Sequence, residues 1–121
     1  MAFNFTYSTP DMDGNVLITG ITGSPTPGII TIPRENESGN NVIGIADDAF
    51  SSVFNFDTFN LTFDSFSNIE TIGENAFYNC SGFTGGLIIP NSVTTIGENA
   101  FFGCSGFEGG AYYSKFGYYD R

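Results

Sequence analysis

The 121-residue chain contains no histidine and no tryptophan, and only three of its residues are lysine or arginine. Without histidine the commonest general base of enzymes is missing, so neither a Ser-His nor a Cys-His catalytic pair can form. We therefore expect no enzyme activity. Thirteen acidic residues give a net charge of −10, which disfavours nucleic acid and anionic membrane surfaces, because both require a basic face on the protein.

Charged residues and long apolar runs are also scarce. Charged residues make up 13% of the chain, and no apolar run is long enough to cross a membrane, so we expect no membrane insertion. Aromatic residues make up 17%, which argues against disorder and predicts a core filled by Phe and Tyr rings. Met1 to Asn4 lack the basic and apolar regions of a signal peptide. We expect a chain that either stays inside the cell or is the mature part of an exported protein.

One stretch of the sequence occurs twice. Residues 96–110 repeat residues 72–86 after 24 positions. The two copies differ only at three pairs of positions: Tyr78/Phe102, Asn79/Gly103 and Thr84/Glu108. A fainter copy precedes them, in which Phe50 stands 27 residues before Phe77. A fixed period of this length is typical of stacked repeats, in which no single unit can bury its own apolar side.

The repeat predicts a mostly β fold, wound as a short solenoid. Each turn of the coil is expected to hold a short strand, a loop, a second short strand and a small helical or 3-10 corner. Successive turns would stack about 4.8 Å apart through backbone hydrogen bonds, so that equivalent side chains form interior columns. The expected columns are Phe50/Phe77/Phe101, Ile45/Ile72/Ile96, Val53/Cys80/Cys104 and Phe56/Phe83/Phe107.

The start of the chain predicts a β-hairpin. Residues 3–22 alternate apolar and polar side chains on both sides of a turn that contains Pro10 and Asp13-Gly14. The acidic run in this turn could also suggest calcium, but the ligand spacing and closing Glu of a calcium loop are missing, so a hairpin turn is favoured. We predict a single domain, 1–121, with three parts: a hairpin cap and linker (3–28), about three repeats (29–110) and a Tyr-rich C-terminal strand or cap (111–121).

The repeated residues resemble a known family. Ile89 to Phe107 resembles the BspA-like, Treponema-type leucine-rich repeat, and Asp13 to Gly20 resembles the hairpin that often precedes such repeats. The resemblance covers roughly residues 3–110. It implies a right-handed leucine-rich-repeat solenoid from a bacterial or protozoan surface protein, used in adhesion and in binding host or matrix proteins, with no catalytic residues and no cofactor. Two departures are Phe83 and Phe107, which stand where the family usually has Leu, and the array is short.

We therefore predict non-enzymatic protein recognition or adhesion by a module located outside the cell or on a bacterial cell surface. The binding face is expected on a parallel sheet formed by strands near Ile30, Leu61, Leu87 and Ala111. The candidate binding residues are those that point outward from this sheet or lie in the Tyr-rich segment: Thr31, Thr62, Ile88, Tyr112, Tyr113, Tyr118 and Tyr119. The alternatives are a structural or self-associating unit of a longer array, including an end-to-end homo-oligomer, and a carbohydrate-binding module that uses the four tyrosines.

The two cysteines occupy equivalent places in adjacent turns. Cys80 and Cys104 correspond to Val53 in the preceding turn, so we predict two buried free thiols. A disulfide between them and half of a metal site are the alternatives, although stacked side chains point in parallel rather than toward each other.

Acidic residues also recur at equivalent places. Glu74 and Glu98 are expected to satisfy free backbone amides at the start of a corner rather than to act as an acid-base pair. The acidic cluster that best fits a weak calcium site combines Asp47-Asp48 with Glu35 and Glu37. For this cluster solvated loop charge is the default expectation, so no metal site is predicted.

Overall fold

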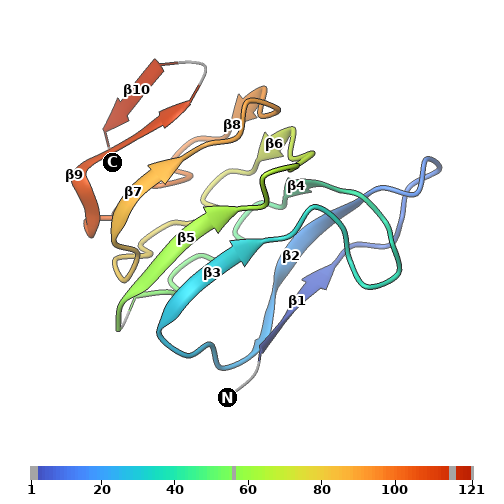
Figure 1. The fold of residues 1–121 in the computed structure, drawn as a ribbon, viewed down its shortest axis with the longest axis horizontal. Helices are drawn as coiled ribbons and strands as arrows, with labels where there is room; N and C mark the ends of the chain where they lie inside the picture. The colour runs from blue at the N-terminus through green and yellow to red at the C-terminus, as the bar shows by residue number, and fades with distance from the viewer. Residues whose placement is uncertain (1–2, 56, 115–116, 121) are drawn as a thin grey trace.

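A computed structural model of the chain describes residues 3–55, 57–114 and 117–120. These residues form ten strands and no helix (Figure 1). The strands are β1 (Phe3–Tyr7), β2 (Val16–Gly23), β3 (Gly28–Ile32), β4 (Val42–Ile45), β5 (Phe59–Phe63), β6 (Thr71–Ile72), β7 (Gly85–Ile88), β8 (Thr95–Ile96), β9 (Phe107–Ser114) and β10 (Gly117–Asp120). No helix in the described residues is therefore long and apolar enough to cross a membrane.

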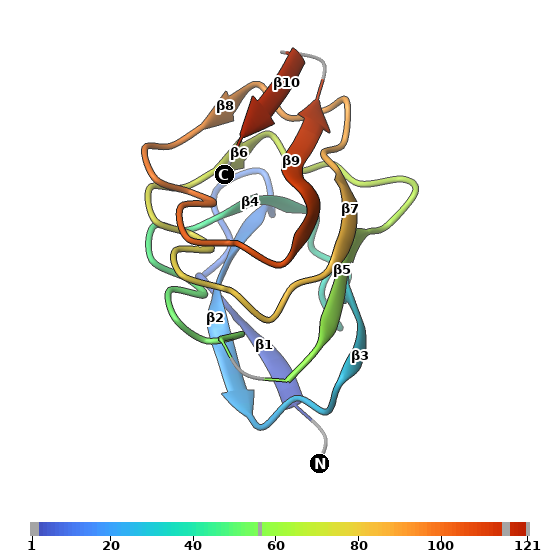
Figure 2. The ribbon, with the colours of Figure 1, turned by 90° about the vertical axis from the view of Figure 1, so that its left-hand side faces the viewer.

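The chain winds as a solenoid with two sides. On one side β2, β4, β6 and β8 pair in parallel, and β1 adds an antiparallel strand at the N-terminal end. On the other side β3 pairs with β5 and β7 pairs with β9, again in parallel (Figure 2). Each turn thus gives one strand to each side, and the apolar side chains are buried between them. The expected solenoid is confirmed.

Stacked aromatic rings fill the interior. The ring centroids of Phe50 and Phe77 lie 5.2 Å apart, and those of Phe77 and Phe101 also lie 5.2 Å apart with nearly parallel planes. A second pair, Phe83 and Phe107, stacks at 5.8 Å. All of these rings are buried, as the repeat predicts. Phe56, which the repeat places in the same column as Phe83, lies outside the described residues.

The corners connect the two sides, and they differ from the expected helical or 3-10 form. We define the first corner as residues 46–53, the second as 73–80 and the third as 97–104; all three are runs of turns. Asp48 and Ser52 in the first corner have φ of 59°, which is left-handed and interrupts any helix. Equivalent residues of the later corners share this geometry: Asn75, Asn79, Asn99 and Gly103.

The left-handed residues explain how the corners stack. In the first corner the N–H groups of Asp48, Phe50 and Ser52 donate to carbonyls of the second corner at 2.7–2.9 Å. The intervening N–H groups donate to the carbonyl three residues earlier in their own turn, at 3.0–3.3 Å. In a helix the N–H groups would bond within the corner and would not reach the next coil. Alternating turns direct every second N–H toward the neighbouring corner, which joins the two.

The hairpin closes the N-terminal end of the core. β1 and β2 pair from Phe3↔Gly23 to Tyr7↔Ile18, and the Phe5 ring lies 6.0 Å from Phe50. In the turn between them one carboxylate oxygen of Asp11 accepts hydrogen bonds from the N–H groups of Asp13 and Asn15, both at 2.9 Å. This acidic run therefore serves the turn.

Candidate functional site

Three of the predicted binding residues lie on one face of the solenoid. Thr31 of β3 and Thr62 of β5 are exposed, are direct partners in the strand register, and share a 3.0 Å hydrogen bond between their hydroxyls. Ile88 of β7 leaves 78% of its surface exposed, and it lines the same depression as Thr62. The fold therefore brings together strand residues that are distant in the sequence.

The four tyrosines lie in a hairpin beside this face. In the backbone register Tyr112 is opposite Leu87 and Tyr113 is opposite Ile88. β10 returns antiparallel to β9, with Tyr118 opposite Tyr113 and Tyr119 opposite Tyr112. The backbone thus places Tyr112 and Tyr113 next to β7, and Tyr118 and Tyr119 one strand further away, on the far side of β9. Their side chains lie outside the described part of the structure, so their role in binding stays a prediction.

The sheet on this face is divided, which differs from the single parallel sheet that we expected. β3 and β5 form one sheet, and β7, β9 and β10 form another. Between β5 and β7 the described residues form a single bridge, Phe59↔Phe83. Past this bridge Gly85 adopts φ of 79°, and the pairing of β7 with β9 shifts in register between Gly85 and Leu87. The ladder of β7 is therefore formed with β9, while β5 forms its ladder with β3.

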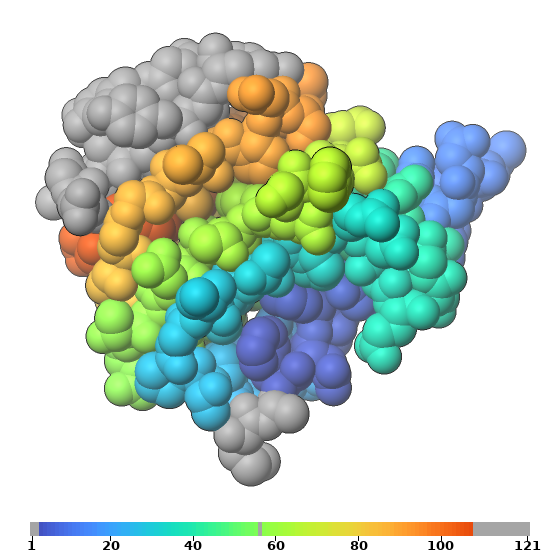
Figure 3. Space-filling model, in the orientation of Figure 1, coloured from blue at the N-terminus to red at the C-terminus, as the bar shows by residue number. Residues whose placement is uncertain are grey.

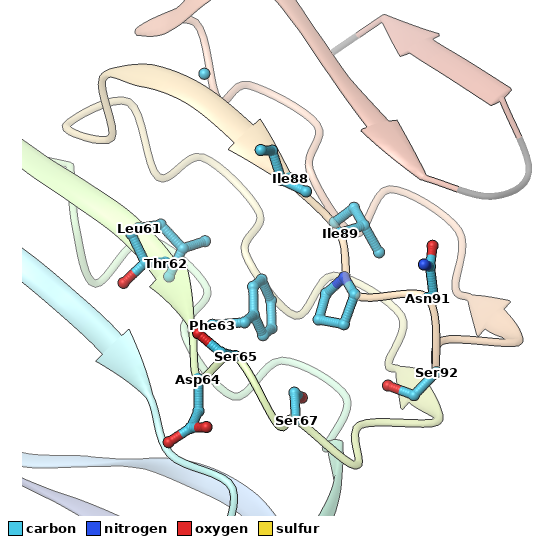
Figure 4. Close-up of a pocket in the computed structure, with 12 residues that line it drawn as sticks. Leu61, Thr62, Phe63, Asp64, Ser65, Ser67, Ile88, Ile89, Asn91 and Ser92 are labelled. Carbon is cyan, nitrogen blue, oxygen red and sulfur yellow. The ribbon is translucent and has the colours of Figure 1, made fainter.

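A groove of about 550 Å³ is lined by residues of β5 and β7 and of the segments that follow these two strands. Figure 4 shows the Phe63 ring standing in it between β5 and the segment that follows β7, with Ile88 and Ile89 on the far side. Hydroxyl groups of Thr62, Ser67 and Ser92 lie around this apolar floor. The same face is seen in the space-filling view, with the green residues of β5 beside the yellow-orange residues of β7 (Figure 3).

Local hydrogen bonds shape the polar rim of the groove. A carboxylate oxygen of Asp64 accepts the N–H of Phe66 at 2.8 Å, and Ser67 Oγ accepts the N–H of Ile69 at 3.2 Å. Ser92 Oγ differs, because it is buried and has no hydrogen-bond partner among the described residues. A buried hydroxyl without a partner is costly, because nothing replaces the hydrogen bonds that it would make in water.

Sequence reasoning identified Thr62 and Ile88 but missed the floor and rim of the groove. The signal was present in the spacing: Phe59 and Phe83 are 24 residues apart, whereas Leu61 and Leu87 are 26 apart. The two additional residues are the Gly85-Gly86 pair. A repeat that lengthens within a strand must bulge, and a bulge next to a paired strand opens the sheet.

The cysteines belong to the core and not to the groove. Cys80 and Cys104 are free and buried, as expected, and their Sγ atoms donate to the backbone carbonyls of Phe50 and Phe77 at 3.0 Å each. Burial raises the pKa of Cys80 to about 11. Burial, and then the nearby Cys80, raise the pKa of Cys104 to about 12. Both groups are therefore neutral thiols, which are poor nucleophiles and poor metal ligands.

One acidic side chain of the corners has a structural role, and one acidic side chain of the preceding loop lies near a base. Asp47 Oδ1 accepts the backbone N–H of Glu74 at 2.7 Å, so a carboxylate does satisfy a corner amide, but it is Asp47 rather than Glu74 that supplies it. A carboxylate oxygen of Glu35 lies 3.8 Å from a guanidinium nitrogen of Arg34. Among the described residues no group of three His, Cys, Asp or Glu side chains is arranged to hold a metal ion.

Known proteins share this architecture. The family model for the BspA-type leucine-rich repeat region matches residues 32–114, in six copies. A leucine-rich cell surface protein from Faecalibacterium prausnitzii A2-165 superposes with a TM-score of 0.67 at 27% identity; the match covers 85% of this chain and 27% of that protein, so this chain spans about a quarter of its length. The match to the leucine-rich repeat protein of T. pallidum covers 85% of this chain and 66% of that protein. Its sequence identity is 18% and its TM-score is 0.39. No curated protein sequence matches the chain.

Proposed function

Since this chain belongs to the BspA-type leucine-rich repeat family, we propose that it is a non-enzymatic module that recognises another protein through the face formed by β3, β5 and β7. Repeat scaffolds of this kind present extended binding surfaces rather than catalytic centres. The structure from Faecalibacterium prausnitzii is described as that of a cell surface protein, which supports the same location for this chain.

The observation that carries the proposal is the groove beside Thr62 and Ile88. Two large apolar side chains on this face are strongly exposed, Ile29 at 74% and Ile88 at 78%. Hydroxyl and amide groups line the groove with Ile88, and one of these residues, Thr62, is paired with Thr31 through its hydroxyl. Apolar anchors within a polar rim are the usual composition of a protein interface. Exposed isoleucines are unfavourable in water, and an interface would bury them.

A binding screen with a matched pair of variants tests the proposal. The chain would be immobilised and challenged with purified extracellular-matrix proteins in a pull-down assay. We expect Ile88→Asp to weaken a positive interaction by about tenfold or more, because it places a charge in the centre of the contact. Met12→Asp is the control, since Met12 is fully exposed in the hairpin turn and away from this face.

Other outcomes point to other functions. Absence of binding to every matrix protein, together with oligomers whose size grows with concentration, would overturn the proposal in favour of self-association. Binding on a glycan array that is lost in Tyr112→Ala and retained in Ile88→Asp would instead indicate a carbohydrate-binding module. Equal loss of binding in Met12→Asp and Ile88→Asp would show that the contact does not lie on this face.

A further inference from the structure

The outer side of the corners carries a pair of exposed aromatic rings. Tyr78 of the second corner and Phe102 of the third stack with ring centroids 5.6 Å apart and planes 15° from parallel, yet 36% and 55% of their surfaces are exposed. In the first corner the equivalent position, directly after the ring of the interior column, holds Ser51. Because the fold accepts serine there, the corner does not require an aromatic side chain at this position. The two rings therefore keep apolar surface in water without being needed for the coil.

Two carboxylates lie on the same outer side of these corners. Glu74 precedes Tyr78 by four residues, and Glu98 precedes Phe102 by four; both acids are exposed, whereas the Ala-Phe pair between each acid and its ring is buried. Neither acid has an ion-pair partner in the part of the chain that the structure describes. Equivalent positions of adjacent coils are about 4.8 Å apart, so these two like charges repel each other. A cationic group bound beside them would relieve the repulsion.

The two rings and the two carboxylates form a surface that is separate from the groove. We call it the corner face and define it by four residues: Glu74, Tyr78, Glu98 and Phe102. None of them lines the groove. In Figure 2 the three corners stack along the left of the molecule, whereas β3, β5 and β7 lie on the right. A partner could therefore contact the corner face without touching the face used in the proposed function.

We propose that the corner face is a second interaction surface, which binds an arginine-bearing segment of a basic partner protein. The inference goes beyond the proposed function and does not depend on it. A guanidinium group is planar, so it stacks on an exposed ring and donates paired hydrogen bonds to a carboxylate. Rings and unpaired carboxylates together are the groups that the corner face offers. A lysine ammonium carries the same charge, but it is compact and strongly hydrated and lacks the flat shape for stacking.

The charge of the whole molecule favours the same partner. Thirteen acidic residues stand against three basic ones, so a basic protein is attracted and an acidic one is repelled. Within the described residues the basic side chain is Arg34, and its guanidinium lies 3.8 Å from a carboxylate oxygen of Glu35. No base in the described part of the chain therefore neutralises the corner face. A neutral carbohydrate would gain nothing from this field, which favours a cationic ligand over a sugar.

Two peptides of equal charge test the inference. The probes are fluorescent octapeptides, one of alternating arginine and glycine and one of alternating lysine and glycine, with binding followed by fluorescence anisotropy. We expect the arginine peptide to bind about fivefold more tightly than the lysine peptide, and both to weaken with added salt. The double variant Tyr78→Ser, Phe102→Ser should remove this preference by weakening the arginine peptide alone. Tyr78→Leu, Phe102→Leu keeps the apolar bulk without the aromatic rings and should remove the preference as well.

Matched variants in the hairpin turn localise the effect, because this turn lies outside both the corner face and the face of β3, β5 and β7. Met12→Ser removes an exposed apolar side chain there and should leave both affinities unchanged. Glu98→Gln should weaken both peptides by about threefold, the effect of one exposed ion pair. Asp13→Asn removes a carboxylate from the turn and should change both affinities by less than about twofold.

The results separate this inference from the proposed function. No binding of the arginine peptide, equal binding of the two peptides, or an unchanged preference in both double variants would overturn the inference. Equal losses in Glu98→Gln and Asp13→Asn would overturn it too, since attraction would then come from the net charge alone. Glycan-array binding that is lost in Tyr78→Ser, Phe102→Ser, without binding of the arginine peptide, would assign the corner face to carbohydrate instead. A matrix protein that bound this double variant normally and lost affinity in Ile88→Asp would leave the proposed function intact in each of these cases.

Discussion

At the scale of single residues, Cys80 and Cys104 show how one position changes its chemistry from turn to turn. Each thiol donates to the carbonyl of a Phe in the preceding corner at 3.0 Å, which joins neighbouring turns from inside the core. Val53, which the repeat places at the same position in the first turn, is partly buried and packs against the core. The thiols are thus small apolar groups with an additional weak hydrogen bond.

Their raised pKa values predict a stability that depends on pH. Above about pH 9, the unfolded chain loses thiol protons that the folded chain keeps, since the folded pKa values are about 11 and about 12 against an ordinary thiol pKa of 9.0. The unfolded state then binds fewer protons, so the free energy of unfolding falls as pH rises through this window, by up to about 1.4 kcal/mol per pH unit for each thiol. Urea unfolding at several pH values measures this fall.

The matched control removes the thiols and keeps their size. In the double variant Cys80→Val, Cys104→Val the contribution of the thiols disappears, so its stability should decline less steeply between about pH 8 and about pH 10.5. The stability difference between the wild-type chain and this variant should therefore change by a few kcal/mol in favour of the variant. Parallel curves for the two proteins would show that the thiols do not titrate on unfolding.

At the scale of elements, the corners illustrate what a sequence can and cannot predict. The recurrence of Ala and Phe located the corners and the ring column correctly, because burial of identical side chains requires stacking. Their backbone form was not predicted, since alternate left-handed residues look from the sequence like ordinary capping residues. Glu74 and Glu98 were expected at the start of helical corners, whereas the residues that follow them, Asn75 and Asn99, both have positive φ. In the second corner the N–H of Asn75 donates to the carbonyl of Glu98 in the third.

The spacing between corners depends on glycines that a neighbouring backbone approaches closely. A Cβ on Gly97 would lie 2.5 Å from the backbone nitrogen of Glu74 and 2.7 Å from its Cα, so the second and third corners could not keep their present distance. We expect Gly97→Ala to lower the free energy of unfolding by about 1–3 kcal/mol, through overpacking. Chemical denaturation followed by circular dichroism gives this value.

Gly86→Ala is the control for the loss of a glycine, because nothing lies within 4 Å of a Cβ at that position. Its free energy of unfolding should stay within about 0.5 kcal/mol of the wild-type value. If both variants were equally destabilised, the effect would come from the flexibility of glycine in general. The close approach of the corners would then not be the cause.

At the scale of the whole molecule, the groove is the part of the site that the sequence predicted least. Thr31, Thr62 and Ile88 could be placed on one face because strand alternation fixes which side chains point outward. The opening beside them depends on where β5 and β7 stop pairing, which is a relation between two coils. A repeat read as uniform predicts a continuous sheet, so it does not reveal that β5 and the next coil share only the bridge between Phe59 and Phe83 among the described residues.

The column of rings also couples the turns into one cooperative unit. Phe77 is fully buried and stacks on both neighbours, Phe50 and Phe101, at 5.2 Å. In a solenoid each turn is stabilised by its interfaces with adjacent turns, so a defect in the middle turn weakens two interfaces at once. Phe77→Leu should therefore lower the free energy of unfolding by about 1–3 kcal/mol, from lost ring stacking and a poorer fit, without changing the denaturant slope.

Phe102→Leu provides the same chemical change on the outside of the coil. Phe102 also stacks on an aromatic ring, that of Tyr78 at 5.6 Å, but 55% of its surface is exposed. The free energy of unfolding of Phe102→Leu should stay within about 0.5 kcal/mol of the wild-type value, because solvent already reaches both rings of the pair. A cost as large as that of Phe77→Leu would mean that ring stacking itself, and not burial between two turns, holds the solenoid together. A reduced denaturant slope in Phe77→Leu would instead mean that the end turns unfold independently of the middle one.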